Sequence, residues 1–197
     1  MTGLRDLLTT LLTITTDTHD TDDDARGWLL RTGVVDLVAP FVTRLPTDPG
    51  DLTRFAGLDG GTAAQLLERL SPVRLADRQN HAPTLGTLLA AAAAHPEEVE
   101  LGGYLVGPGR ADERITVERL DVYGVGTLLA PDRPGTPITP ADVAADVRRM
   151  DPDATAMLVW GLVQHLGVDD ATGPPDLVTE RVNPWRPNET CWSLWWD

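Results

Sequence analysis

Apolar residues recur at helical spacing through much of the first half of the chain. Leu4, Leu7, Leu8, Leu11 and Leu12 follow the i, i+3, i+4, i+7, i+8 pattern of an amphipathic helix. Thr21 and Asp24 have the spacing of a capping box, which predicts a second helix through Trp28 to Leu30 that ends at Gly33. The apolar pattern predicts further helices over residues 34–45, with a kink at Pro40, and over 84–94.

The pattern changes to strict alternation at residues 98–123. Val99, Leu101 and Leu105 alternate with Glu100 and Tyr104, which predicts a strand with one apolar face. A loop rich in glycine, proline and charge follows, and then a second β-type run. The segment therefore predicts a central antiparallel hairpin with a longer connection.

The second run of this hairpin changes phase in its middle. Ile115 and Val117 have one parity, whereas Leu120 and Val122 have the other. A β-bulge at Glu118-Arg119 would return all four apolar side chains to one face. We therefore predict a bulge at this position.

The last third of the chain mixes helices and strands. A Gly/Pro-rich linker over 124–137 precedes two predicted helices, 139–150 and 153–166, and two predicted strands, 177–182 and 190–196. The resulting prediction is an α+β fold, with a helical N-terminal part, the hairpin at about 98–123, two further helices and a C-terminal strand pair in the same sheet. We divide the chain into residues 1–124 and 138–197, packed as one compact unit.

Residues 51–70 resemble a helix-turn-helix, with Gly57 in the turn. This resemblance implies a winged-helix-like DNA-binding regulator in which Arg54, Gln65 and Arg69 contact nucleic acid. Three such side chains are few for base and phosphate contacts. A structural helix pair and a protein-contacting winged helix are the alternatives.

Charge then narrows the classes of function. The formal net charge is −14 at pH 7, and the 16 basic residues are all arginines because the chain has no lysine. Repulsion disfavours non-specific binding to nucleic acid or to an anionic membrane. Without lysine, a P-loop of the usual kind, a pyridoxal Schiff base and a Ser–Lys dyad are excluded.

The single Cys191 excludes a disulfide framework within one chain. No apolar run is long enough to span a membrane, and residues 1–6 lack the order of a signal peptide. We expect a soluble, cytoplasmic protein that does not contact a membrane.

Templates for metal and nucleophile sites fit the sequence poorly. Asp20, Asp22 and Asp24 match the first ligands of an EF-hand loop, but Ala25 replaces its glycine and Arg31 its bidentate glutamate. The four histidines are far apart in sequence, and neither serine lies in a G-x-S-x-G motif. We therefore expect no metal and no cofactor. A hydrolase built from Asp and His residues distant in sequence stays a third hypothesis.

Arg78, Gln79, Asn80 and His81 form a dense set of side-chain donors in an irregular stretch. Loops held by a scaffold often carry function, but hydrogen bonds within the loop are the alternative explanation.

Four of the six tryptophans lie in the last thirteen residues, and they suggest either a strand that seals the core or a contact surface. Our leading hypothesis is a non-catalytic, acidic interaction or regulatory protein. It would bind a protein partner, or a second copy of itself, through the Trp-rich strand and the hairpin face. The expected contact residues are Trp185, Trp192, Trp195, Trp196 and Tyr104.

Overall fold

The computed structural model describes residues 3–4, 6–9, 26–48, 50–129 and 139–197. Residues 4 and 6–9 are helical, which fits the start of the predicted N-terminal helix, whereas the expected Thr21–Asp24 capping box lies outside the described residues. The later helices are α2 Trp28–Arg31, α3 Val34–Val38, the 3-10 helix η1 Ala39–Phe41, α4 Gly60–Arg69, α5 Pro72–Leu75, α6 Leu85–Ala94, α7 Val125–Leu129, α8 Pro140–Arg149 and α9 Pro152–His165. The strands are β1 Val42–Arg44, β2 Leu52–Leu58, β3 Val99–Val106, β4 Arg114–Tyr123, β5 Leu177–Val182 and β6 Thr190–Trp195.

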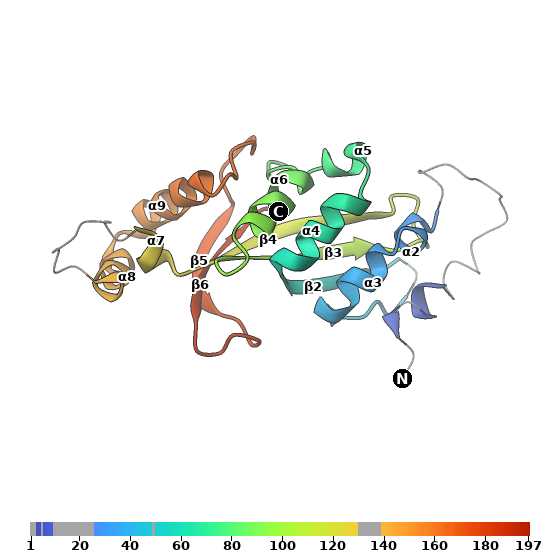
Figure 1. Ribbon diagram of the computed structural model, residues 1–197, viewed down its shortest axis with the longest axis horizontal. Coiled ribbons are helices and arrows are strands. Elements are labelled where there is room, and N and C mark those ends of the chain that lie inside the picture. The colour runs from blue at the N-terminus through green and yellow to red at the C-terminus, as the bar shows by residue number, and fades with distance from the viewer. Residues whose placement is uncertain (1–2, 5, 10–25, 49, 130–138) are drawn as a thin grey trace.

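These strands form one antiparallel sheet in the order β1-β2-β3-β4-β6-β5. The sheet runs through the middle of an elongated molecule, with α2 and α3 toward one end and α7, α8 and α9 toward the other (Figure 1). Because β6 pairs with β4, the C-terminal strands join the hairpin in a single sheet. The α+β prediction is confirmed.

The β3–β4 hairpin and its bulge lie where the sequence predicts them. Gly102 pairs with Arg119, but the next residue, Gly103, pairs with Val117, so Glu118 is the extra residue. The phase change is thereby absorbed, and Ile115, Val117, Leu120 and Val122 are all buried on the core side. The bulge prediction is confirmed.

Helices α4 and α6 cover the apolar face of the sheet. The side chains of Leu85, Leu88 and Leu89 on α6 are buried against it. A Cβ at Gly60, at the start of α4, would collide with the backbone carbonyl of Ala92 on α6. The alanine-rich sequence of α6 therefore allows the two helices to pack closely.

Two predicted helical segments contain strands instead. The predicted helix over 34–45 ends in η1 and continues as β1, because proline at position 40 cannot sustain the helical hydrogen bonds. Residues 51–70 are not a helix-turn-helix, since Leu52–Leu58 forms β2 and only Gly60–Arg69 is helical. Asp59 separates the two elements by capping α4, where its carboxylate accepts from the backbone N–H of Thr62 at 2.7 Å.

Helices α8 and α9 begin and end within one residue of the prediction, whereas α7 lies in the segment that was predicted as a linker. Thr139 and Asp142 form a reciprocal capping box at the start of α8. Helix α9 ends at His165, and Gly167 follows with φ +90°, a conformation that favours glycine. Within the described residues, none of the helices combines the length and the apolar character needed to cross a bilayer.

Candidate functional site

The two edges of the sheet differ in how they are protected. At one edge, β1 has three residues, a shifted register and prolines on either side, at positions 40 and 46. At the other edge, β5 has six residues in regular register with β6, from Leu177 opposite Trp195 to Val182 opposite Thr190. Native proteins shield edge strands with short length, proline, charged residues or bulges. Prolines flank β5 at positions 175 and 184, as they flank β1, but β5 is longer than β1 and its register is regular. It presents an extended, regular edge.

The apolar residues of β5 are unusually open. The side chains of Leu177 and Val182 are each 51% exposed, at the two ends of the strand. Its charged residues are Glu180 and Arg181, and Glu180 is bound by Arg148 of α8 at 2.6 Å. The strand thus offers backbone hydrogen-bonding groups along one side and an apolar contact at each end.

The three tryptophans at the end of the chain occupy two different environments. Trp192 and Trp195 lie in β6, opposite Glu180 and Leu177 respectively, and both are partly buried one strand in from the edge. Trp196 is 1% exposed, and its ring packs edge-on against Trp160 at 5.8 Å. Trp196 therefore seals the core, whereas Trp192 and Trp195 extend apolar surface toward β5.

Tyr104, expected to join the same surface, lies elsewhere. It is 6% exposed on β3, which is separated from β5 by β4 and β6. The guanidinium groups of Arg54 and Arg114 lie 5.8 and 5.9 Å from its ring centroid. The structure does not bring Tyr104 together with the tail tryptophans.

A buried polar network holds the loop between β5 and β6 on the sheet. Glu100 Oε2 of β3 accepts from the hydroxyl of Tyr123 at 2.8 Å and from Nε1 of Trp185 at 2.7 Å. The side-chain amide of Asn183 donates to Asp121 Oδ2 at 3.1 Å and to the hydroxyl oxygen of Tyr123 at 2.6 Å. Glu100, Asp121, Tyr123 and Asn183 are all buried. The loop is therefore anchored by charge-assisted hydrogen bonds to two central strands.

Flat side chains fill the space between this loop and the sheet. A Cβ at Gly57 of β2 would lie 2.7 Å from the indole of Trp185, so glycine provides the room for that ring. The guanidinium of Arg186 lies 3.8 Å from the ring centroid of Tyr123 and 3.4 Å from Glu100 Oε1. The loop thus contacts β2, β3 and β4, and its position fixes the β5–β6 hairpin.

Charge is buried beneath the loop as well. Asp121 is fully buried, and its Oδ2 lies 3.2 Å from Nε of Arg119. Among the described residues, Asp121 Oδ1, Asn183 Oδ1 and both Nε and Nη2 of Arg119 have no hydrogen-bond partner, so Arg119 and Asp121 are joined as an ion pair only. Removing one partner of such a pair strongly destabilises the folded protein, because the other charge is left buried and uncompensated. The network therefore specifies one position of the loop.

The same burial makes the reactive groups of the network inert. Burial, followed by the nearby charge of Asp121, raises the pKa of the Cys191 thiol to about 12. Burial is also the main cause that raises the pKa of Tyr123. Neither group ionises near neutral pH, and a cysteine nucleophile acts as its thiolate. The network is suited to holding a loop in place.

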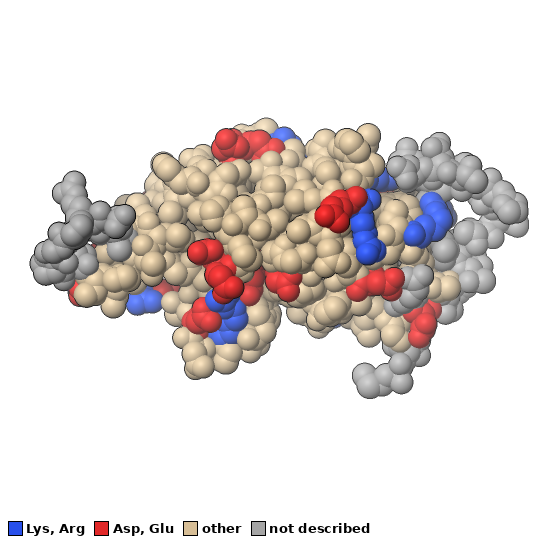
Figure 2. Space-filling view, in the orientation of Figure 1, with Lys and Arg blue, Asp and Glu red and all other residues tan. Residues whose placement is uncertain are grey.

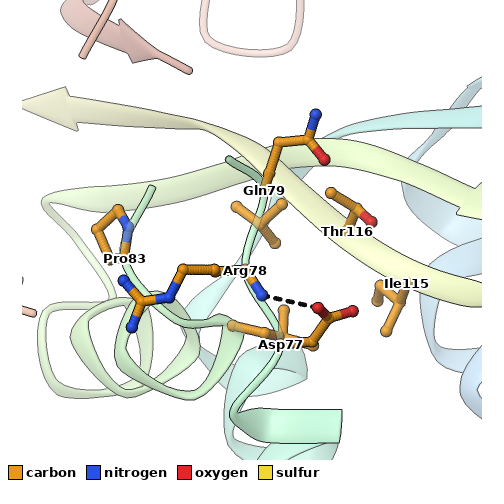
Figure 3. Close-up of a pocket in the computed structure, with 8 residues that line it drawn as sticks. Asp77, Arg78, Gln79, Pro83, Ile115 and Thr116 are labelled. Carbon is orange, nitrogen blue, oxygen red and sulfur yellow. Dashed lines mark hydrogen bonds between the residues drawn. The ribbon is translucent and has the colours of Figure 1, made fainter. Parts of the chain in front are cut away.

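The four loop donors bind other segments of the chain. Arg78 Nη1 donates to the carbonyls of Ala82 at 3.2 Å and Asp170 at 3.0 Å, and the Gln79 side chain accepts from Tyr104 at 3.1 Å. Asn80 bonds the carbonyl of Asp197, and His81 Nδ1 lies 3.1 Å from the Thr172 hydroxyl. The loop passes beside β4, where it encloses a hollow of about 10 Å³ next to Ile115 and Thr116 (Figure 3). This volume is close to that of one water-sized probe, so the loop serves mainly to join segments.

The residues expected to read DNA are dispersed. Arg54 lies on β2 and pairs with Glu118 at 2.5 Å. Gln65 and Arg69 lie on α4, where Gln65 bonds the carbonyl of Gly61 and Arg69 bonds those of Thr32 and Gly33. Since the first helix of the motif is absent, the DNA-binding alternative loses the element on which it depended.

Acidic and histidine side chains do not gather into a metal centre among the described residues. His165 Nδ1 lies 2.7 Å from the carbonyl of Gly161 one turn earlier, and His81 is held by Thr172.

Sequence reasoning missed the polar network. Glu100 lies between apolar residues of β3, and Arg119, Asp121 and Tyr123 repeat at period two after the bulge. This period-two spacing of polar residues was the available signal, although it does not reveal that the β5–β6 loop covers that face of the sheet. Comparisons with protein-family models, with curated proteins and with solved structures find no match for this chain.

Proposed function

We propose that this protein is a non-catalytic binding protein whose β5 edge receives an extended segment of a protein partner. The observation that carries the proposal is the regular six-residue edge of β5, which lacks the short length and the register shift of β1. A partner strand would continue the antiparallel sheet through main-chain hydrogen bonds, and its side chains would contact Leu177 and Val182.

The charge around this edge favours a basic partner. Glu189, in the β5–β6 loop, lines two neighbouring hollows of about 300 Å³ each, one with Glu180 and the other with Glu97 and Glu98. Arg148 borders the first hollow and pairs with Glu180, and Arg186 borders the second and pairs with Glu189, but acids outnumber arginines in both. Acidic side chains surround a basic group over this part of the surface (Figure 2). A second copy of the chain would itself bring a net charge of −14, so repulsion opposes self-association. An extended segment that carries both apolar and basic residues fits the edge and its charge.

The rigid loop supports the same function. Trp185 is 40% exposed although its indole N–H is bound to Glu100. An aromatic ring that is already fixed loses little conformational freedom on binding. A partner would reach Trp185 by continuing from the Val182 end of β5 along the β5–β6 loop, because the ring lies over β2 and β3.

A peptide of seven residues that alternates valine and lysine is a direct probe of this edge. We expect it to bind at least about tenfold more tightly than a valine–glutamate peptide of the same length at low ionic strength. The difference should shrink at high salt, because exposed charges are screened. Fluorescence anisotropy of the labelled peptides measures both affinities.

Two double variants separate the edge from general charge. Leu177→Lys/Val182→Lys adds positive charge at the exposed ends of β5 and should weaken binding of the valine–lysine peptide at least about tenfold. Leu45→Lys/Val73→Lys adds the same charge at side chains that are 46% and 76% exposed outside β5, and should change binding little. Equal weakening by both variants, or equal affinity for both peptides, would refute the proposal. Binding of a second copy instead would appear as a dimer in sedimentation and would exclude the basic partner.

A further inference from the structure

Arginine side chains surround two adjoining hollows at the end of the molecule formed by α2, α5 and the β3–β4 loop. The larger hollow is about 300 Å³ and is bordered by Arg26, Arg74 and Arg114. The smaller is about 110 Å³ and is bordered by Arg69 and Arg74. Trp28 lines both, so they form one groove. Several basic side chains lie toward this end on the face shown in Figure 2.

The groove is built on a fixed framework. The guanidinium of Arg74 lies 4.6 Å from the ring centroid of Trp28, which is 4% exposed. The indole N–H of Trp28 donates to the backbone carbonyl of Glu113 at 3.1 Å. Arg114 is held by Asp112 at 2.7 Å and by the hydroxyl of Thr116 at 3.1 Å. The side chains of Arg74 and Arg114 are thus held in position before any ligand binds.

The carboxylates that line the groove are engaged by other groups. Asp112 accepts from Arg110 at 2.8 and 2.7 Å as well as from Arg114. Glu113 is buried, and its two oxygens accept from the backbone N–H groups of Gly27 at 2.5 Å and Leu29 at 3.0 Å. Asp77 Oδ1 accepts from the backbone N–H of Arg78 at 2.9 Å. Asp112 and Glu113 therefore have both carboxylate oxygens bound within the fold, and Asp77 has one.

Two arginines keep their charge without a carboxylate partner among the described residues. Arg69 donates to the carbonyl oxygens of Thr32 and Gly33, at 3.3 and 3.4 Å, and to no acid. Arg26 borders the larger hollow, and its side chain makes no ion pair with the described residues. With Arg74 and Arg114, these side chains give the groove four guanidinium groups facing three engaged carboxylates. In a chain of net charge −14, this is a local excess of cationic donors.

We propose that this groove binds a small molecule that carries a phosphate or diphosphate group. Guanidinium groups bind phosphate oxygens through paired N–H donors, and arginine is favoured wherever such recognition occurs. The volume of the larger hollow lies at the lower end of that of small-molecule sites. Nucleic acid fits less well, since the acidic remainder of the surface repels an extended polyanion.

Titration with inorganic pyrophosphate by isothermal calorimetry tests this site on the full chain. We expect saturable binding of the wild type at low ionic strength, and at least about tenfold weaker binding by Arg26→Gln and by Arg74→Gln. Arg181→Gln removes the same charge from an exposed position on β5 and should bind like the wild type. Near-UV circular dichroism checks that Trp28 keeps its packing in Arg74→Gln, and Arg26→Gln removes no described side-chain contact.

Either of two results would overturn the proposal. If the wild type gives no saturable heat of binding with millimolar pyrophosphate, the groove is not an anion-binding site. Equal weakening by Arg181→Gln and Arg26→Gln would show attraction by overall charge alone. A nucleoside diphosphate that binds more tightly than pyrophosphate would identify the ligand class further, whereas a phosphoserine peptide that binds more tightly than either would contradict the small-molecule assignment. None of these results bears on the β5 edge, so the two sites can fail separately.

Discussion

Replacing Asp121 with alanine should lower the free energy of unfolding by about 3 kcal/mol, because it leaves the buried guanidinium of Arg119 without its partner. None of the surface of Asp121 is accessible to solvent. Its carboxylate also accepts a hydrogen bond from the side-chain amide of Asn183. Asp121→Ala therefore breaks the ion pair and the anchor of the β5–β6 loop together. Urea unfolding, followed by circular dichroism, measures the loss.

The matched control is Asp146→Ala on α8. Its ion pair with Arg149 is on the surface, where the two side chains are 71% and 72% exposed, so this change should leave the unfolding midpoint nearly unchanged. Asp121→Asn keeps the shape and one acceptor and should fall between Asp121→Ala and the wild type. An Asp121→Ala protein as stable as the wild type would contradict the role given to the network.

Gly103→Ala should be comparably damaging, with a loss of about 3 kcal/mol, at the upper end of what overpacking causes. A Cβ at Gly103 would penetrate the backbone carbonyl of Thr116 on the paired strand, just where the register shifts at the bulge. The strands would have to separate to accommodate one methyl group. Thermal or urea unfolding of the variant measures the effect.

Gly161→Ala provides the matched comparison, because a Cβ there meets nothing within 4 Å. This position lies inside α9, where alanine is favoured over glycine by about 0.5–1 kcal/mol. The same substitution should therefore stabilise the protein at position 161 and destabilise it at position 103. A Gly103→Ala protein that keeps wild-type stability would show that β3 and β4 are not packed as described.

The hairpin and its bulge could be predicted because each depends on residues close together in sequence. The alternation of Val99, Leu101 and Leu105 and the phase change at Glu118-Arg119 specify local geometry directly. The capping box at Thr139 and the stop at Gly167 are local in the same sense. The α+β prediction rests mainly on these locally determined elements.

Strand β2 could not be predicted in the same way. Leu52, Phe55 and Leu58 are spaced by three, which matches a helix as well as an irregular strand. The register between β2 and β3 shifts between Phe55 and Leu58, so the burial pattern there departs from simple alternation. Pairing with β3, about fifty residues further along the chain, decides the structure. Tertiary contacts therefore override local spacing.

The candidate site was foreseen only in part. The concentration of tryptophan pointed to the β5–β6 hairpin, but it did not separate Trp196, which is buried, from Trp185, which is 40% exposed. Asn183 gave no signal at all, since its role depends on Asp121 and Tyr123 from a strand sixty residues away. Long-range polar contacts of this kind are set by the assembled sheet.

The topology also determines which experiments are informative. A truncation after Asn183 would remove β6, which lies between β4 and β5, and would leave β5 without its neighbour. Loss of binding would then follow from loss of the sheet. Point changes at Leu177 and Val182 are more informative, because substitutions at exposed positions usually alter stability little.

Hydrogen exchange of the backbone amides in the presence of the valine–lysine peptide tests the β5 edge most directly. If the peptide adds a strand there, exchange over residues 177–182 should slow by at least about tenfold, while residues 42–44 at the other edge keep their rates. Leu177→Lys/Val182→Lys should abolish the slowing. Unchanged exchange over residues 177–182 at saturating peptide, or equal slowing at both edges, would contradict a partner-binding role for β5.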